Sequence, residues 1–352
     1  MKLIKKQLTG KSYSVVNKYA GYDNYLAVDW SQSTMAIAMI RAPYQNRIRV
    51  TEHPSSLKQL QQLLKSLSGK TIIALEESSP AHWLFVNLYD YAAKVVICDP
   101  YQNRLLTQGP KTDPIDAQKL STLLYNGMLK ETYHAKKEEF ELRKYISAYS
   151  DLIKRGVRLQ NQKTAFLGQD GLSRKTRNLS KAEKESTKFI LNQLEEDIQQ
   201  YEKQKKDFEV LFTGLCKKNK TLKNLMSIPG IGIIGAVTIL GTVIDVKRFD
   251  SVGKFLAYSG LVTHVKQSGG KTYGHRKGRY SRILKQAFKV AASTCINGEN
   301  ELSALYKDLL KRGVSQHNAR NAVARYVARV TFGILKTEKP FISKKTKVKS
   351  KK

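Results

Sequence analysis

The sequence is poor in acidic residues. Asp and Glu number 29 among 352 residues, against 62 Lys and Arg, so the formal net charge is +33. Such an excess repels itself unless a polyanion is nearby, so nucleic acid is the first partner to consider and an anionic membrane surface the second. The excess is uneven, since residues 251–352 carry 23 basic and 4 acidic side chains, a net of +19.

Cysteine is also scarce. The three cysteines, Cys98, Cys216 and Cys295, lie far apart and form no CxxC pair. This spacing argues against a zinc finger and favours a reducing compartment. The first residues, MKLIKKQLTGKSYS, contain no apolar stretch of the kind that a secretory signal needs, so we expect a cytoplasmic protein.

Long apolar runs are lacking, with one exception between Leu225 and Ile244. This segment has no charged residue and is long enough to cross a bilayer. It contains Pro229, Gly230 and three further glycines, however, and this composition favours a turn between two helices over one spanning helix. We therefore expect no membrane association.

The N-terminal region has the alternation of strands and helices that is typical of α/β proteins. Five apolar runs bounded by turn residues predict strands over residues 25–30, 35–41, 47–51, 71–76 and 95–98. Helices are predicted over residues 57–67, 80–93 and 113–125, the last two opened by proline in or before their first turn. This order indicates a mixed sheet with helices packed on it.

The middle of the chain, residues 136–222, has no proline and is rich in Lys, Glu, Gln and Leu. Apolar residues three and four positions apart predict two long helices, broken around 168–177. They form either an antiparallel or intermolecular coiled coil or a helical spacer within one domain. We expect a mainly helical remainder, and we divide the chain into a basic lead (1–24), an α/β domain (25–130), a helical linker (131–222), a C-terminal domain (223–340) and a basic tail (341–352).

Four carboxylates lie where predicted strands end or a predicted helix begins. Asp29 ends the first strand, Glu76 ends a later one, and Asp113 and Asp116 share one face of a helix because they are three residues apart. Ligands bind at strand ends in α/β sheets. Converging carboxylates favour Mg²⁺ or Mn²⁺, and two such ions can clamp the attacking and leaving oxygens of a phosphodiester.

Local structural roles are the alternative for these carboxylates. Asp113 could cap a helix and Asp29 could belong to a turn. Glu77 and Asp99 lie at comparable places in the pattern. Spacing by itself therefore does not separate Glu76 from Glu77.

The C-terminal region contains two further candidate sites. The run from Pro229 to Gly232, which holds Gly230, predicts a helix-hairpin-helix element that binds phosphates through backbone amides, or a plain tight turn. Ser268 precedes two glycines in a basic loop, and it is either a turn residue that contacts phosphate or a nucleophile. The candidate nucleic-acid-binding cations around it are Lys271, Arg276, Lys277, Arg279 and Arg282.

Other residues of this loop compete for the same roles. Ser281 lies in the basic run that opens the next helix, so it is the rival nucleophile. His264 and His275 are close enough in sequence to act as bases, or they contact phosphate or solvent.

The motifs VDW at Asp29, LEES at Glu76, KTDPIDA at 111–117 and IPGIG at 228–232 together resemble the DEDD transposases of insertion sequences. That family has a RuvC-like (RNase H-like) N-terminal domain and includes pilin-gene invertases and bridge-RNA-guided recombinases. The resemblance extends from about residue 25 to residue 341, and the aspartates of TDPIDA are its most specific part. It implies that Asp29, Glu76, Asp113 and Asp116 bind Mg²⁺ or Mn²⁺ and that Ser268 is a covalent nucleophile.

The resemblance also implies a function and partners. We expect a DNA transposase or site-specific recombinase that acts on double-stranded DNA, guided by a structured non-coding RNA, in a prokaryotic nucleoid. Because Ser268 is distant in sequence from the carboxylates, we expect a composite active site in a homo-oligomer, a dimer or tetramer. The alternatives are a Holliday-junction-resolving nuclease with a metal-activated water and a non-catalytic nucleic-acid-binding protein.

Overall fold

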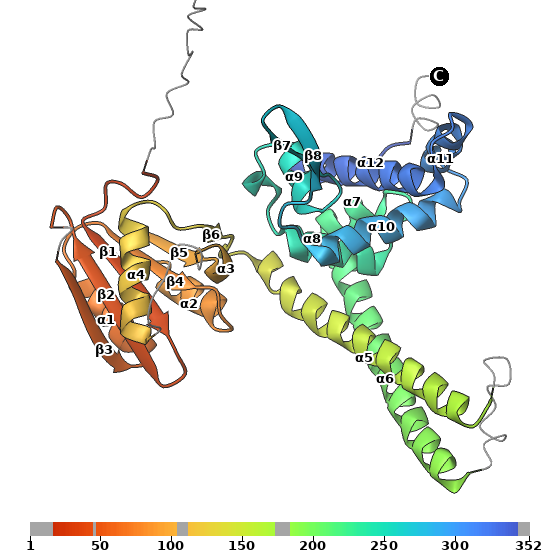
Figure 1. Ribbon diagram of the computed structural model, residues 1–352, viewed down its shortest axis with the longest axis horizontal. Helices are drawn as coiled ribbons and strands as arrows, with labels where there is room; N and C mark the ends of the chain where they lie inside the picture. The colour runs from red at the N-terminus through yellow and green to blue at the C-terminus, as the bar shows by residue number, and fades with distance from the viewer. Residues whose placement is uncertain (1–16, 45–46, 104–111, 173–183, 344–352) are drawn as a thin grey trace, which may run out of the picture. The chain divides into compact units, whose positions relative to one another are not determined.

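The computed structural model describes residues 17–44, 47–103, 112–172 and 184–343. The chain divides into two compact units, Met1–Lys136 and Lys137–Lys352 (Figure 1). Most of the predicted basic lead, most of the basic tail and part of the break between the two long helices lie outside the described residues.

The N-terminal unit contains a mixed sheet of six strands in the order β3-β2-β1-β4-β5-β6. β1 pairs antiparallel with β2 and parallel with β4, β4 pairs parallel with β5, and β6 closes the sheet antiparallel to β5. The mixed α/β prediction is confirmed, whereas the two-residue strand β6 was missed because it is too short to show a period. The bounds are β1 (Asn24–Trp30), β2 (Thr34–Arg41), β3 (Ile48–Pro54), β4 (Thr71–Glu76), β5 (Lys94–Cys98) and β6 (Glu131–Thr132).

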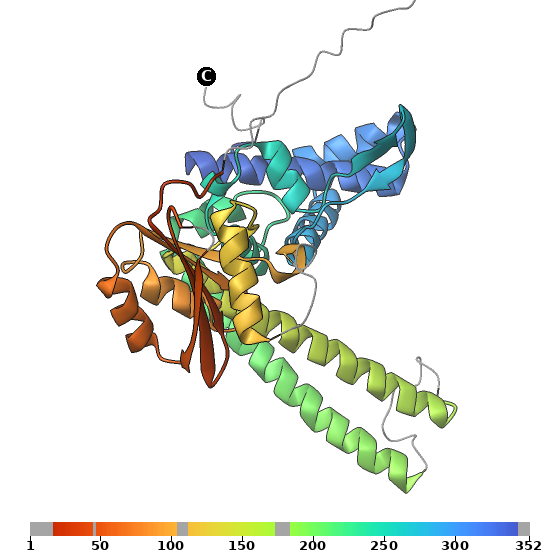
Figure 2. The same cartoon turned by 60° about the vertical axis from the view of Figure 1, so that its left-hand side comes forward.

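Helices cover both faces of this sheet (Figures 1 and 2). α1 (Leu57–Ser66) and α2 (Ala81–Leu88) pack on one face, and α4 (Asp113–Tyr125) packs on the other. The short α3 (Pro100–Asn103) follows β5. Strands that are buried on both faces read as continuous apolar runs, which is why LAV in β1 and IIAL in β4 were recognisable. The arrangement is compatible with an RNase H-like domain.

The C-terminal unit begins with two long helices, α5 (Leu142–Gln169) and α6 (Glu185–Lys218), which lie side by side (Figure 1). Their outer halves bury Leu152, Leu159, Leu194, Ile198 and Tyr201 against each other. Their inner ends belong to a larger helical core. The two helices are therefore confirmed, while a regular coiled coil or an intermolecular pairing stays a prediction.

Among the residues that the structure describes, six shorter α-helices complete the core of this unit, and one two-stranded hairpin extends from it. The run between Leu225 and Ile244 folds as the end of one helix, a turn and a second helix. In the residues that the structure describes, no helix is long and apolar enough to cross a membrane. The bounds are α7 (Lys220–Met226), α8 (Ile233–Val243), α9 (Val252–Tyr258), β7 (His264–Ser268), β8 (Lys271–Arg276), α10 (Arg282–Ile296), α11 (Glu301–Lys311) and α12 (Gln316–Thr337).

All three cysteines are buried. Cys98 is buried under α4, and Cys216 and Cys295 are buried in the helical core of the C-terminal unit. Among the described residues no disulfide joins them. Burial raises the pKa of the Cys295 thiol to about 11, so this side chain is a packing residue and not a nucleophile.

Candidate active site

Asp29 and Glu76 lie on the same face of the sheet because side chains alternate along a strand. Tyr25 and Ala27 of β1 pack under α4, and so do Ile72 and Ala74 of β4. Asp29 lies two residues after Ala27, and Glu76 two residues after Ala74, so their side chains point to the same face of the sheet. β1 and β4 run parallel with Val28 opposite Leu75, which places the two carboxylates at the same end of neighbouring strands.

Asp113 and Asp116 lie in the first turn of α4, at the same end of the sheet. Ala117, which follows directly, packs against Ala36 of β2, and Ala36 is the cross-strand partner of Asp29. Asp113 is exposed, whereas the Asp116 side chain keeps 28% of its surface exposed and lies 3.8 Å from Lys119 Nζ. Thus the four predicted carboxylates come from three elements that meet at one edge.

The chemistry of this set fits a hard divalent cation, since all four side chains offer carboxylate oxygens. Within the described ranges, no three His, Cys, Asp or Glu side chains already lie close enough together to hold a metal ion. Residues 104–111, which precede α4 and include Lys111 of the KTDPIDA motif, lie outside those ranges. Metal binding by the four carboxylates therefore stays a prediction.

The competing acidic residues have other contacts. Asp99 is 6% exposed, and its Oδ1 accepts a hydrogen bond from the Tyr101 amide at 3.1 Å, a capping contact for α3. Glu77 lies one residue beyond Glu76, and its Oε2 is 2.8 Å from His134 Nε2. The geometry therefore favours Glu76 as the member of the set on the α4 face.

Ser268 lies at the tip of an exposed hairpin in the C-terminal unit. It pairs with Lys271 across a two-residue turn in which Gly269 and Gly270 both have positive φ, 55° and 76°. Such a turn needs residues without a Cβ penalty at both positions, which explains the glycine pair. Every residue from His264 to Ser268 is exposed, so the Ser268 hydroxyl is accessible to a large substrate.

Cations surround this hairpin. Lys271, Arg276, Lys277, Arg279 and Arg282 are all exposed, from the second strand of the hairpin to the first residue of α10. The sequence reasoning missed Lys285, which lies on α10 within cation–π distance of Tyr280, 4.8 Å from the ring centroid. The close side-chain contact with Lys277 lowers the pKa of Lys285, because two ammonium groups disfavour each other's charge.

Ser281 has a structural role. Its Oγ accepts a hydrogen bond from the Leu284 amide at 3.2 Å, which caps α10, and its own amide donates to the Tyr258 carbonyl at 2.9 Å. A capping serine is held by the helix that it starts. His264 and His275 belong to the two strands of the hairpin and are exposed.

The glycines of the predicted helix-hairpin-helix differ from each other. Gly230 has a φ of +86°, and a Cβ there would collide with the Ala291 carbonyl oxygen of α10. Gly232 has an ordinary φ of −89° and open space at its Cβ position. Close packing thus explains Gly230 without any ligand, and a phosphate-binding role for the turn stays a prediction.

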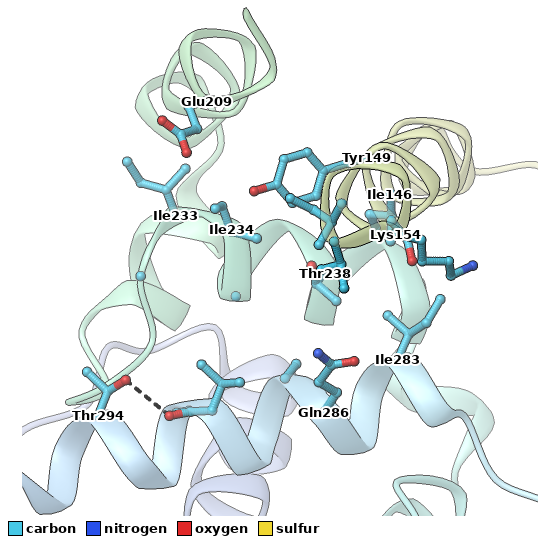
Figure 3. A pocket seen from close by; sticks show the side chains of 18 of the residues that line it. Ile146, Tyr149, Lys154, Glu209, Ile233, Ile234, Thr238, Ile283, Gln286 and Thr294 are labelled. Carbon is cyan, nitrogen blue, oxygen red and sulfur yellow. Dashed lines mark hydrogen bonds between the residues drawn. The ribbon is translucent and has the colours of Figure 1, made fainter. Parts of the chain in front are cut away.

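A groove of about 1410 Å³ lies next to this turn. It is lined by α5, α6, α8 and α10, and Figure 3 shows Ile233, Ile234 and Thr238 of α8 bordering it with Gln286 of α10. Of the predicted site residues, Gly230 and Gly232 alone line it. Ser268 and the cations around it are not among the residues that line this groove.

Comparison with known families gives two matches, the first of which continues from the N-terminal unit into α5. A family model described as a transposase, the DEDD type of IS110 elements, matches residues 26–169. A second, described as the transposase IS116/IS110/IS902 family, matches residues 222–307. The chain belongs to the DEDD transposases of insertion sequences.

Two relatives support this membership. An "Insertion element IS110 uncharacterized 43.6 kDa protein" of Streptomyces coelicolor is 26% identical over 149 residues, which are 42% of this chain and 37% of that protein. A "Probable family 20 transposase" of Pseudomonas aeruginosa is 22% identical over 286 residues, 76% of this chain and 84% of that protein. The match thus spans well under half of the first relative and most of the second.

Gly230 and Gly232 allow a direct test of the turn. We expect Gly230→Ala to lower the free energy of unfolding by roughly 2 kcal/mol or more, because the new Cβ meets a backbone carbonyl and the positive φ is strained. Gly232→Ala is the matched control: its Cβ position is open, so it should lower the melting temperature far less, by the change of the α8 N-cap alone. Thermal unfolding followed by circular dichroism measures both, and an unchanged melting temperature for Gly230→Ala would contradict the packing role.

Proposed function

We propose that the protein is a DNA transposase or site-specific recombinase that cleaves and rejoins DNA strands by metal-assisted attack of Ser268. The observation that carries the proposal is the placement of the carboxylates. Asp29 and Glu76 end parallel neighbouring strands on the face that α4 covers, and α4 brings Asp113 and Asp116 to the same edge. In α/β proteins, ligands bind at such carboxyl ends of the strands.

In this proposal, residues of the C-terminal unit supply the nucleophile and bind the DNA. Ser268 Oγ would attack a phosphodiester phosphorus, its proton passing to a base for which His264 and His275 are candidates. One DNA oxygen leaves as a hydroxyl, and the protein keeps the phosphate as a serine ester. A second DNA hydroxyl then attacks that ester and regenerates the serine.

The other side chains hold the phosphates and the ions. Lys271, Arg276, Lys277, Arg279 and Arg282 would neutralise the DNA backbone on either side of Ser268. Asp29, Glu76, Asp113 and Asp116 would hold Mg²⁺ or Mn²⁺, drawn together as the cation binds. When bound, these ions stabilise the charge that develops on the phosphoryl oxygens.

The covalent step gives the decisive test. Wild-type protein incubated with its DNA ends and Mg²⁺ should yield a protein–DNA adduct that survives denaturing electrophoresis. Ser268→Ala should lose the adduct by about 10³-fold or more, because the nucleophile is gone. Ser281→Ala, the matched control, should lose about 1 kcal/mol of stability with its helix cap and keep the adduct. Cleavage without an adduct in both wild type and Ser268→Ala would support a junction-resolving nuclease that uses water.

We further propose a homo-oligomer in which the serine and the carboxylates of one reaction come from different copies of the chain. Asp116→Asn and Ser268→Ala should each be inactive, because each lacks one half of the machinery. Mixing the two proteins should restore strand cleavage, measured on labelled DNA. Continued inactivity of the mixture, together with cleavage by a monomeric wild-type fraction in sedimentation analysis, would contradict the shared site.

A structured non-coding guide RNA is the remaining partner that we propose. The net charge of +33 suits RNA as well as DNA, and we expect the complex to form in the prokaryotic cytoplasm at the nucleoid. Sequencing of RNA that copurifies with the protein should recover one transcript from the flank of its own gene. Recovery of bulk cellular RNA in proportion to abundance would show binding by charge alone.

A further inference from the structure

The N-terminal unit contains a hydrogen-bonded chain around one buried imidazole, and the proposed reaction does not use it. His134 lies just after β6, and its side chain is 2% exposed. Its Nε2 is 2.8 Å from Glu77 Oε2, and its Nδ1 is 3.3 Å from Nδ1 of His82 in the first turn of α2. The ring centroid of Phe85, also in α2, lies 5.6 Å from that of His134. Three elements, the end of β4, α2 and the segment after β6, thus meet at one imidazole.

The chemistry of Glu77 sets the direction of these hydrogen bonds. A carboxylate only accepts, so the His134 Nε2–H group donates to Glu77. In neutral His134 the other ring nitrogen is then an acceptor, and it receives the Nδ1–H of His82. Each nitrogen of His134 therefore has a defined partner, which fixes the orientation of the ring.

Glu77 is also fixed through its backbone. Its amide donates to the Cys98 carbonyl at 3.0 Å, so the pairing of β4 with β5 continues to Glu77. Alternation then places the Glu77 side chain on the α2 face and the Glu76 side chain on the α4 face. A fixed Glu77 side chain therefore also restrains the backbone between Glu76 and Glu77. This restrains the position of the Glu76 side chain on the opposite face.

A second contact connects the same segment to the turn after α2, and it provides a comparison. Lys136 Nζ lies 2.8 Å from Asp90 Oδ2, but both side chains are at least half exposed, at 50% and 68%. Exposed ion pairs contribute little. The His134–Glu77 contact differs because one partner is buried and the other adjoins Glu76.

We propose that Glu77 and His134 are positioning residues that hold Glu76 in place for the divalent cation. This inference rests on the proposed function, because it takes Glu76 as one of the metal-holding carboxylates. Residues that orient a metal ligand without touching the metal commonly change metal affinity 10- to 100-fold when they are lost. His82 would act one step further away, by orienting His134.

The test measures Mn²⁺ binding to the full-length protein by calorimetry, beside its melting temperature. His134→Phe and Glu77→Leu remove the hydrogen bond, and we expect each to raise the Mn²⁺ dissociation constant about 10-fold. His134→Gln keeps an N–H donor and Glu77→Gln keeps an acceptor, so both should bind Mn²⁺ like the parent. Asp90→Asn, which breaks the exposed Lys136 pair, is the matched control and should also leave Mn²⁺ binding unchanged.

The outcomes separate this inference from the proposed function. If Asp29→Asn weakens Mn²⁺ binding while His134→Phe and Glu77→Leu do not, the positioning role is wrong and the metal site stands. If Asp29→Asn leaves Mn²⁺ binding unchanged, the proposed metal site itself has failed, and this inference falls with it. Should His134→Phe not fold, His134→Asn, whose amide is too short to reach Glu77, takes its place with the same expected loss.

Discussion

The alternation of side chains along β1 and β4 is the constraint on which the candidate active site depends. Both faces of the sheet are covered, so each residue of these strands is committed to the α4 face or to the α1 and α2 face. If the register of these strands shifted by one residue, Asp29 would point to the opposite, apolar face. Glu77 would then replace Glu76 on the α4 face. The apolar runs that bury the sheet therefore also set the direction in which the carboxylates point.

The C-terminal unit, by contrast, keeps the Ser268 hydroxyl and several cationic side chains exposed. Its helical core packs the apolar run from α7 to α8 against α10, and Gly230 makes the close approach to Ala291 possible. The hairpin extends from this core and carries almost no buried side chain, so its position depends on its turn and on the Ser281 anchor to Tyr258. The large excess of positive charge in this third of the chain is thereby tolerated, because the cations stay in water until a polyanion binds.

The strands of the N-terminal unit and the two long helices could be predicted, because continuous apolar runs and three-four spacing are signals that neighbouring residues carry themselves. The bounds of α4 at Asp113 and Tyr125 agree with the predicted helix, in which Pro114 is acceptable in the first turn. The hairpin of β7 and β8 was missed, since its exposed strands have no apolar alternation to report them. The short β6 and the contact of His134 with Glu77, 57 residues away, were invisible because they exist only through long-range packing.

The sequence by itself determined the family, and it supplied the residues on which the proposed chemistry rests. The order of Asp29, Glu76 and the TDPIDA aspartates, together with the basic serine loop, is a property of residue types and spacing. The tertiary structure alone decided which acidic residues share a face, that Glu77 turns to His134 instead, that Ser281 is a cap, and that Gly230 is required by packing. The physical reason is that a side chain's direction is set by the register of its strand and by what packs on each face, and both depend on residues far away in the chain.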